Sequence, residues 1–301
     1  MSPFFRRLAG ALSVSLTLFA GRALACSVCG CDPAALTLGL DRPSTNSVRL
    51  AVEDRYLTKE SGLDTEFEGE RENRMLLRAQ FAPAKKFVAQ IEVPLFLWRD
   101  HIGTTGTVDD TARGLGDVQV TGRYELLRTG GFVPRHVLSL VGSLKLPTGA
   151  NNRSLDGAVD EHIQLGTGSW DPSLGLWYTF GDHPWTWYTG GTVRLNTQNS
   201  RHFQYGNVLS YVGGVRRAFF DDRFFLSLEG QARYAGYDHG VDGIDPNSGG
   251  FLGYATGGAA VAIGADLLAR IQVQVPVVSG LHGLQNEHTV AFAGLSWDFA
   301  M

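Results

Sequence analysis

Apolar and polar residues alternate one by one along most of this chain. In residues 117–127, the even positions carry Val, Val, Gly, Tyr and Leu, while the odd positions up to 125 carry Asp, Gln, Thr, Arg and Glu. Residues 224–234 and 270–277 repeat the pattern. Because successive side chains of a β-strand point to opposite faces, this period of two predicts strands with one polar and one apolar face. The sequence therefore predicts an all-β fold.

The composition narrows this all-β fold to two classes of protein. The chain has 38 glycines, 11% aromatic residues and a mean hydropathy of −0.05. After residue 25 there is no run of roughly 18 apolar residues, which excludes helical membrane spans. A secreted β-protein and an outer-membrane barrel remain, and both agree with alternating strands.

The connections between the strands decide between these two classes. Twelve segments fit strands, near residues 47–57, 73–82, 86–97, 115–127, 136–147, 163–180, 185–196, 206–219, 224–235, 251–263, 267–278 and 287–299. The connections after odd-numbered segments are medium or long, whereas those after even-numbered segments are short. Short periplasmic turns and long extracellular loops are typical of outer-membrane barrels. We therefore predict a transmembrane antiparallel β-barrel of about 12 strands over residues 47–299, in the outer membrane of a Gram-negative bacterium.

The first 25 residues have the pattern of a cleaved secretory signal peptide. Two arginines precede an apolar run over residues 8–20, and Ala23 and Ala25 form a small-residue cleavage pattern. The apolar run has about 13 residues, too few for a bilayer span of roughly 20. Cleavage after residue 25 leaves 301 − 25 = 276 residues and removes three arginines, so the net charge goes from −4 to −7. A net-negative chain argues against nucleic acid as a partner.

All three cysteines of the chain, Cys26, Cys29 and Cys31, follow this cleavage site directly. They belong to a periplasmic N-terminal segment, residues 26–46, which is long enough when extended to reach through the barrel as a plug. Three uses stay open: a disulfide between Cys26 and Cys29, a lipid on Cys26, and thiolate ligation of Cu(I) or Zn(II). We favour an exposed thiol cluster that makes metal or redox contact with a partner.

The polar faces of the strands point into the barrel if the apolar faces contact lipid. The charged residues on these faces are Asp117, Arg123, Glu125, Lys145, Glu229, Arg233 and Arg270. Rows of opposite charge stabilise many barrel interiors, and the same residues can instead line a permeation path and set its selectivity. Twelve strands imply a narrow pore, because eight enclose a filled interior and sixteen an aqueous channel.

The C-terminal strand and the outer loops indicate partners in the envelope. Gly294, Trp297 and Phe299 resemble the terminal signal that is read by the barrel-assembly machinery. Outer-membrane lipid is expected around the apolar faces of the strands. The acidic loop at residues 60–72 is a solvated face that divalent cations can bridge to lipopolysaccharide.

Four short motifs carry a resemblance to a known family. They are GLGDV (114–118), KLPTG (145–149), LGTGSWDPSLGLWYT (165–179) and YGNVLSYVGGVR (205–216). Together they resemble the outer-membrane barrel family named for a meta-pathway of phenol degradation, whose members are often called transporter-like. The resemblance implies an outer-membrane location and a role in moving small organic, including aromatic, molecules.

Two classes of function follow from these observations. The first is a passive channel or transporter for small organic solutes, aromatic ones included. The second is a metal-handling or partner-docking protein that acts through its N-terminal cysteines. An enzyme is not expected, because Ser200, His202 and His288 come nearest to a barrel hydrolase and form no recognisable catalytic segment.

Overall fold

A computed structural model describes residues 43–61, 68–130, 134–155, 157–159 and 161–300. The strands are β1 (Ser47–Ser61), β2 (Glu68–Ala84), β3 (Phe87–Ile102), β4 (Val108–Leu115), β5 (Gln119–Thr129), β6 (His136–Lys145), β7 (Ser154–Leu155), β8 (Ala158–Val159), β9 (Asp171–Asp182), β10 (Trp185–Arg194), β11 (Val208–Phe219), β12 (Phe224–Ala235), β13 (Asp238–Gly240), β14 (Gly243–Asp245), β15 (Gly250–Ile263), β16 (Leu267–Leu281), β17 (Gln285–Glu287) and β18 (Val290–Ala300). One short 3₁₀ turn, η2, covers Glu161–Ile163. Within the described residues, no helix has the length and apolar character that a membrane crossing needs.

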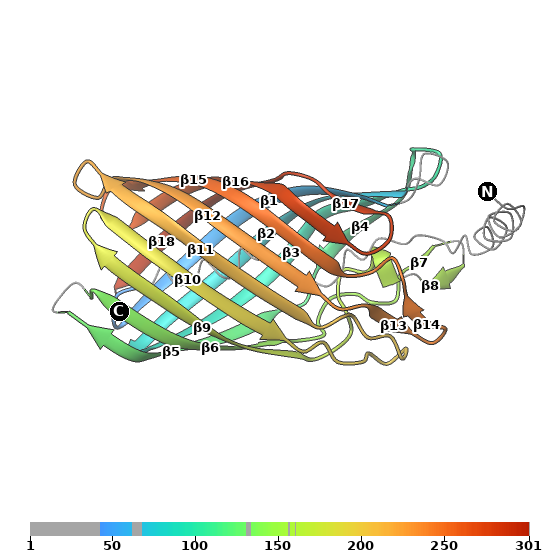
Figure 1. Cartoon of the computed structure of the whole chain (residues 1–301), viewed down its shortest axis with the longest axis horizontal. Helices are drawn as coiled ribbons and strands as arrows, with labels where there is room; N and C mark the ends of the chain where they lie inside the picture. The colour runs from blue at the N-terminus through green and yellow to red at the C-terminus, as the bar shows by residue number, and fades with distance from the viewer. Residues whose placement is uncertain (1–42, 62–67, 131–133, 156, 160, 301) are drawn as a thin grey trace, which may run out of the picture.

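Twelve of these strands form a closed antiparallel barrel (Figure 1). Around the barrel the order is β1, β2, β3, β5, β6, β9, β10, β11, β12, β15, β16 and β18. The sheet closes because β1 pairs with both β2 and β18. At one end, β4 extends the sheet beside β3 and β17 extends it beside β1. The predicted fold class and strand number are confirmed.

The barrel is apolar outside and polar inside. In β5 the side chains of Gln119, Thr121, Arg123 and Glu125 are buried, whereas the alternating Val120 is exposed. Many large side chains on the outer faces of the other strands are exposed Leu, Val, Ile and aromatic residues, as lipid contact requires. A closed barrel also pairs its backbone polar groups between strands, which the hydrocarbon core demands. The polar faces found in the sequence therefore line the interior.

The two ends of the barrel differ in the length of their connections (Figure 1). At the end that carries the C-terminus the turns are short, for example residues 220–223 between β11 and β12. At the other end the connections are long, and β4, β7, β8, β13, β14 and β17 lie there. Short turns face the periplasm in bacterial barrels. The long connections therefore form the extracellular mouth.

Several boundaries differ from the prediction, most clearly in the strand expected at 163–180 and in the loops expected at 58–72 and 98–114, the second of which contains the end of β3 and nearly all of β4. The strand expected at 163–180 begins only at Asp171, because residues 163–169 fold back and are mostly buried instead of continuing the strand. The loop expected at 58–72 is largely strand, since β1 runs on to Ser61 and β2 already begins at Glu68. Charged residues occupy both faces of these extensions, so an apolar face could not reveal them.

The last strand closes the barrel against the first. β18 pairs with β1 over ten consecutive residue pairs. On the inner side, Arg49 donates to the two carboxylate oxygens of Asp298 over 2.5 and 2.7 Å. On the outer side, Trp297 and Phe299 are exposed and stack with their ring centres 5.3 Å apart. Recognition of Gly294 and these two rings by the assembly machinery stays a prediction.

The topology predicts which engineered cysteines react from outside the cell. In a chain whose native cysteines are serine, Asp109→Cys in β4 should react with a membrane-impermeant maleimide on intact cells. Asp221→Cys, in the turn between β11 and β12, should react only after the outer membrane is opened. Both positions are exposed, so only the side of the membrane distinguishes them. Labelling of the second variant on intact cells would overturn the topology.

Candidate functional site in the barrel interior

One wall of the barrel interior is lined by charged side chains, and we call it the charged wall. It comprises Glu53, Arg55 and Lys59 on β1, Glu70, Glu72, Arg74 and Arg78 on β2, Glu92 and Arg99 on β3, and Arg270 on β16. Acidic and basic residues are mixed along this wall. Burial of an unpaired charge is costly. Because acidic and basic side chains are mixed along the wall, each charge has an opposite charge near it.

Glu53 is the centre of the main ion-pair group on the charged wall. One carboxylate oxygen accepts a hydrogen bond from Arg270 over 2.5 Å, although β18 lies between their two strands. Arg78 donates to both oxygens of Glu53 over 3.4 Å and also pairs with Glu92. A single carboxylate is therefore shared by two guanidinium groups, of which Arg78 is also paired with Glu92.

A second group of charges surrounds Glu287 near the extracellular mouth. Glu287 lies in β17, in the connection beyond the transmembrane strands, and its carboxylate is 2.5 Å from Arg233 and 4.0 Å from Lys59. Tyr254 donates its hydroxyl to the second oxygen over 2.5 Å. Burial acts to raise the pKa of Glu287, but the positive charges of Arg233 and Lys59 outweigh it and bring the pKa to about 2. The carboxylate is therefore ionised at neutral pH.

A different surface covers the inner side of β6, β9, β10 and β11, and we call it the aromatic wall. Trp177, Tyr188 and Val212 form a buried cluster there, with Val141 packed against it. The rings of Trp177 and Tyr188 stack almost in parallel, with centres 5.9 Å apart and planes 14° apart. Only 4% of Trp177 and 3% of Tyr188 is exposed. This cluster is an apolar strip on the inner surface of these four strands.

Two glycines let these rings lie flat against the wall. A Cβ atom on Gly190 would approach the Trp177 ring to 2.4 Å, so only glycine leaves room for the indole. A Cβ atom on Gly214 would lie 2.8 Å from the Tyr188 ring and hydroxyl. Lying across Gly214, Tyr188 reaches Glu229 on β12 and donates its hydroxyl over 2.7 Å.

The long connection between β6 and β9 is anchored to the mouth by buried charges. Lys145 Nζ lies 2.6 Å from Asp171 and 3.6 Å from Asp117. Asp117 also accepts hydrogen bonds from the backbone N–H groups of Gly149 and Thr167, over 2.9 and 2.7 Å. These contacts tie the two ends of the connection to one point, which we call the loop anchor.

Three glycines make the loop anchor compact. A Cβ atom on Gly149 would come within 2.8 Å of the Gly166 backbone and within 2.9 Å of the Gly116 backbone. A Cβ atom on Gly166 would lie 2.4 Å from an Asp117 oxygen. The motifs GLGDV, KLPTG and LGTGSWD, far apart in sequence, thus meet here, and their glycines serve close packing.

The anchored connection turns inward between η2 and β9. Gln164 is completely buried, and its backbone carbonyl accepts a 2.5 Å hydrogen bond from Arg99 of the charged wall. Leu165 packs with Phe96 and Ala112, which belong to β3 and β4. Residues 163–169 therefore narrow the extracellular mouth.

Another connection holds this segment from the side of β10 and β11. Arg201 makes a two-pronged ion pair with Glu161, over 2.8 and 2.6 Å. The hydrogen bond to Glu161 raises the pKa of Arg201. Tyr205 donates its hydroxyl to the Glu161 backbone carbonyl over 3.0 Å. The mouth is thus built from several connections that brace one another.

All seven charged residues predicted to face the interior lie on inward positions, with different neighbours. Asp117 and Lys145 belong to the loop anchor, Arg233 pairs with Glu287, Arg270 with Glu53, Glu229 with Tyr188, and Glu125 with Arg128, while Arg123 is buried on β5. The structure does not bring them into one cluster. Whether they line a permeation path stays a prediction. Cys26, Cys29 and Cys31 lie outside the described residues.

Several interior residues were missed by the sequence reasoning. Glu53 and Arg78 follow the same period of two and could have been found by extending the count to β1 and β2. Trp177 occupies an inward position of β9, where Gly190 opposite it on β10 leaves room for the indole. Among the described residues, no group of three or more His, Cys, Asp or Glu side chains is arranged to hold a metal ion.

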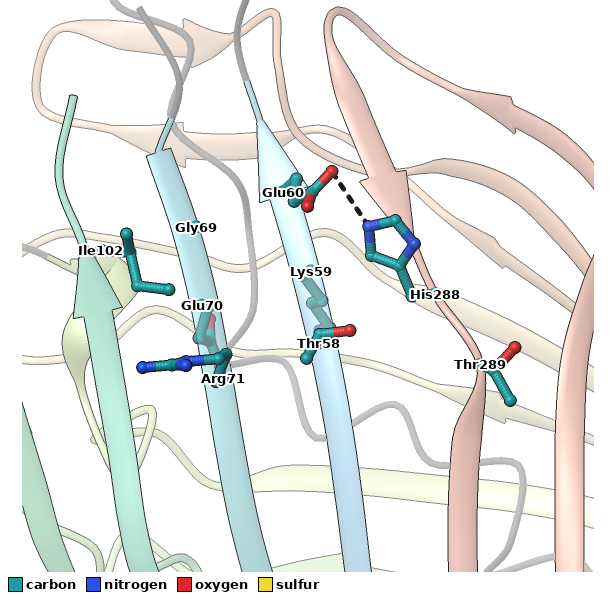
Figure 2. A pocket seen from close by; sticks show the side chains of 9 residues that line it. All are labelled: Thr58, Lys59, Glu60, Gly69, Glu70, Arg71, Ile102, His288 and Thr289. Carbon is teal, nitrogen blue, oxygen red and sulfur yellow. Dashed lines mark ion pairs between the residues drawn. The ribbon is translucent and has the colours of Figure 1, made fainter. Parts of the chain in front are cut away.

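A separate cavity of about 400 Å³ lies at the rim, at the upper ends of β1 and β2 (Figure 2). Its lining includes Glu60 and His288, whose side chains are 3.0 Å apart. Thr58, Glu60 and Arg71 occupy the outward positions of their strands. Lys59 and Glu70 of the charged wall also contribute to its lining, so the cavity borders the barrel interior at the rim.

Comparisons with known proteins agree with the geometry. Among solved structures, the COG4313 outer membrane channel from Pseudomonas putida F1 is similar with a TM-score of 0.72 and 14% identity, over 86% of this chain and 97% of that one. The translocator domain of the autotransporter NalP from Neisseria meningitidis has a TM-score of 0.51 and 10% identity, over 88% of this chain and 93% of that one. At these identities the likeness concerns the fold. No curated protein sequence matches the chain.

A sequence profile identifies the protein family, which the fold alone does not. The profile is described as "Putative MetA-pathway of phenol degradation" and matches residues 41–283. The match includes the loop anchor, both walls of the interior and all the motifs that carried the resemblance. This chain, an outer-membrane β-barrel with a channel-like fold, belongs to that family.

Proposed function

We propose that this protein is a passive channel that carries small organic solutes, aromatic ones among them, across the outer membrane. The observation that supports the proposal is the contrast between the charged wall and the aromatic wall. In the closed order of twelve strands, β10 lies six strands from β1. The two walls therefore face each other across the interior.

A flat ring with a polar substituent fits between two such walls. In the structure only 4% of Trp177 and 3% of Tyr188 is exposed, so a solute ring reaches the aromatic wall after neighbouring interior side chains move aside. Stacking then contributes about 0.5–1.5 kcal/mol beyond burial. The hydroxyl or carboxylate group of the solute can meanwhile exchange hydrogen bonds with the charged wall. Weak contacts at several sites suit passage, because a solute must be able to leave each site again.

The charged residues would set the selectivity of this path. Arg123, Lys145, Arg233 and Arg270 contribute positive charge to the interior. Neutralising all four should shift the reversal potential of the channel toward cations if they border the path. A conducting quadruple variant with an unchanged reversal potential would leave them a structural role only.

Removal of one indole tests the aromatic wall. With the protein in planar bilayers, we expect benzoate to be more permeant than cyclohexanecarboxylate, which has the same charge and a similar size but no aromatic face. Trp177→Ala should bring the two permeabilities together because it removes the stacking surface. Bi-ionic reversal potentials measure the ratio of the two permeabilities.

The matched control for this variant is Trp187→Ala on the neighbouring strand. Trp187 is 51% exposed and faces outward, toward lipid. Its removal should leave the permeability ratio as in the wild type. Equal permeabilities of benzoate and cyclohexanecarboxylate in the wild-type protein would contradict a role for the aromatic wall in solute selection. An equal loss of the preference for benzoate in both variants would contradict it too.

A further inference from the structure

Two consecutive arginines near the periplasmic end of β11 lie on opposite faces of the barrel. Arg216 occupies an inward position, and its guanidinium lies over the Phe225 ring at 5.0 Å. Arg217 points outward and is exposed. The outward face of β11 otherwise carries apolar residues such as Leu209 and Tyr211. Arg217 is therefore a cation on a surface that contacts lipid.

Aromatic rings fix the position of this outward guanidinium. Its central carbon lies 5.1 Å from the Trp185 ring centre and 4.8 Å from the Phe219 ring centre. Trp185 is the direct cross-strand neighbour of Arg217 on β10. Cation–π contacts of this kind use the faces of the rings and leave the N–H donors of the guanidinium available.

No protein acceptor in the described part of the chain uses these donors. Among the described residues, no carboxylate forms an ion pair with Arg217, whose recorded contacts are the two aromatic rings. In the adjacent turn, Asp222 instead pairs with His183 over 3.3 Å. A planar group with five donors thus faces the bilayer without an anion from the chain.

The depth of this group in the membrane identifies the anion. Arg217 lies two residues before the end of β11, among outward aromatic side chains that include Trp187. Belts of such residues mark the level of the lipid headgroups. At the end of the barrel that carries the short turns, these are the headgroups of the periplasmic leaflet.

We propose that Arg217, framed by Trp185 and Phe219, binds the phosphodiester group of one phospholipid in the periplasmic leaflet. The planar fork of a guanidinium matches two phosphate oxygens, and such charge-assisted bonds are stronger than neutral ones. The lipid tails would pack over the exposed Leu226 and Leu228 of the adjacent β12. This binding does not depend on the proposed transport function.

Native mass spectrometry of the full chain, released from a mild detergent with added phosphatidylglycerol, tests the proposal. The wild type should retain one tightly bound lipid, and Arg217→Gln should bind it roughly tenfold more weakly, as the loss of a charge-assisted contact predicts. Arg216→Gln is the matched control on the inner face and should bind like the wild type. Arg217→Lys keeps the charge without the fork and should lie between wild type and Arg217→Gln.

Two further arms distinguish the source of the phosphate. Diacylglycerol, which has the tails without the phosphate, should not be retained. Inorganic phosphate should not compete with the phospholipid, because the tails contribute to its binding. Equal lipid retention by Arg217→Gln and the wild type, retention of diacylglycerol, or displacement by inorganic phosphate would each contradict the proposal. Heat-modifiable migration identifies variants that have folded.

Discussion

Replacing Asp171 by alanine should both open the extracellular mouth and destabilise the barrel. The carboxylate pairs with Lys145 over 2.6 Å and accepts hydrogen bonds from the Thr197 backbone and the Ser169 hydroxyl. Its loss leaves the ammonium group of Lys145 buried without its nearest anion, which costs about 3 kcal/mol. Released from the loop anchor, residues 163–169 should narrow the mouth less. We expect a lower unfolding midpoint and a larger single-channel conductance.

A second ion pair of the same length provides the control for Asp171. Asp110 pairs with Arg153 over 2.6 Å, but the two side chains are 26% and 28% exposed. Ion pairs in contact with water contribute about 0–1 kcal/mol. Asp110→Ala should therefore change stability and conductance little. If the two aspartate variants behave alike, the loop anchor does not constrain the mouth.

Replacing Glu53 by glutamine should have the second large effect. Glu53 is the carboxylate shared by Arg78 and Arg270, and 3% of its side chain is exposed. Without it, two guanidinium groups repel each other inside the barrel, at a cost of about 3 kcal/mol. The uncompensated positive charge should also shift the reversal potential in a salt gradient toward anions.

A second substitution tests whether this effect arises from the ion pair. Arg270→Gln alone should shift the selectivity toward cations, while the double variant Glu53→Gln with Arg270→Gln should return it close to that of the wild type. The double variant should also recover part of the lost stability, because Arg78 keeps its pair with Glu92. If the losses of unfolding free energy in the two single variants add up in the double variant, the two side chains act independently.

The barrel itself could be predicted from the sequence because alternation and loop length are local signals. The polar positions of β5 and β12 were assigned to the interior correctly, since each strand shows its own period of two. The extensions of β1 and β2 were missed because both their faces are polar above the membrane. Hydrophobicity identifies the part of a strand that crosses lipid and cannot mark the part that leaves it.

The walls of the interior depend on register, which a single sequence does not reveal. Trp177 has room on the inner face because Gly190 is its cross-strand neighbour, and nothing within the segment around Trp177 signals that pairing. The loop anchor joins Asp117, Lys145 and Asp171, which are brought together when β6 pairs with β5 on one side and with β9 on the other. The motifs containing these residues were recognisable, but their common position was not.

The central claim is that this barrel conducts, and single-channel recording tests it most directly. Purified protein inserted into a planar bilayer, with potassium benzoate on one side and potassium chloride on the other, should give discrete current steps whose reversal potential shows that benzoate passes. The recording should give the same result for a protein of residues 26–301 and for one of residues 47–301, apart from step size. A heat-modifiable, folded barrel that inserts without current steps, or whose steps carry chloride but no benzoate, would contradict the account.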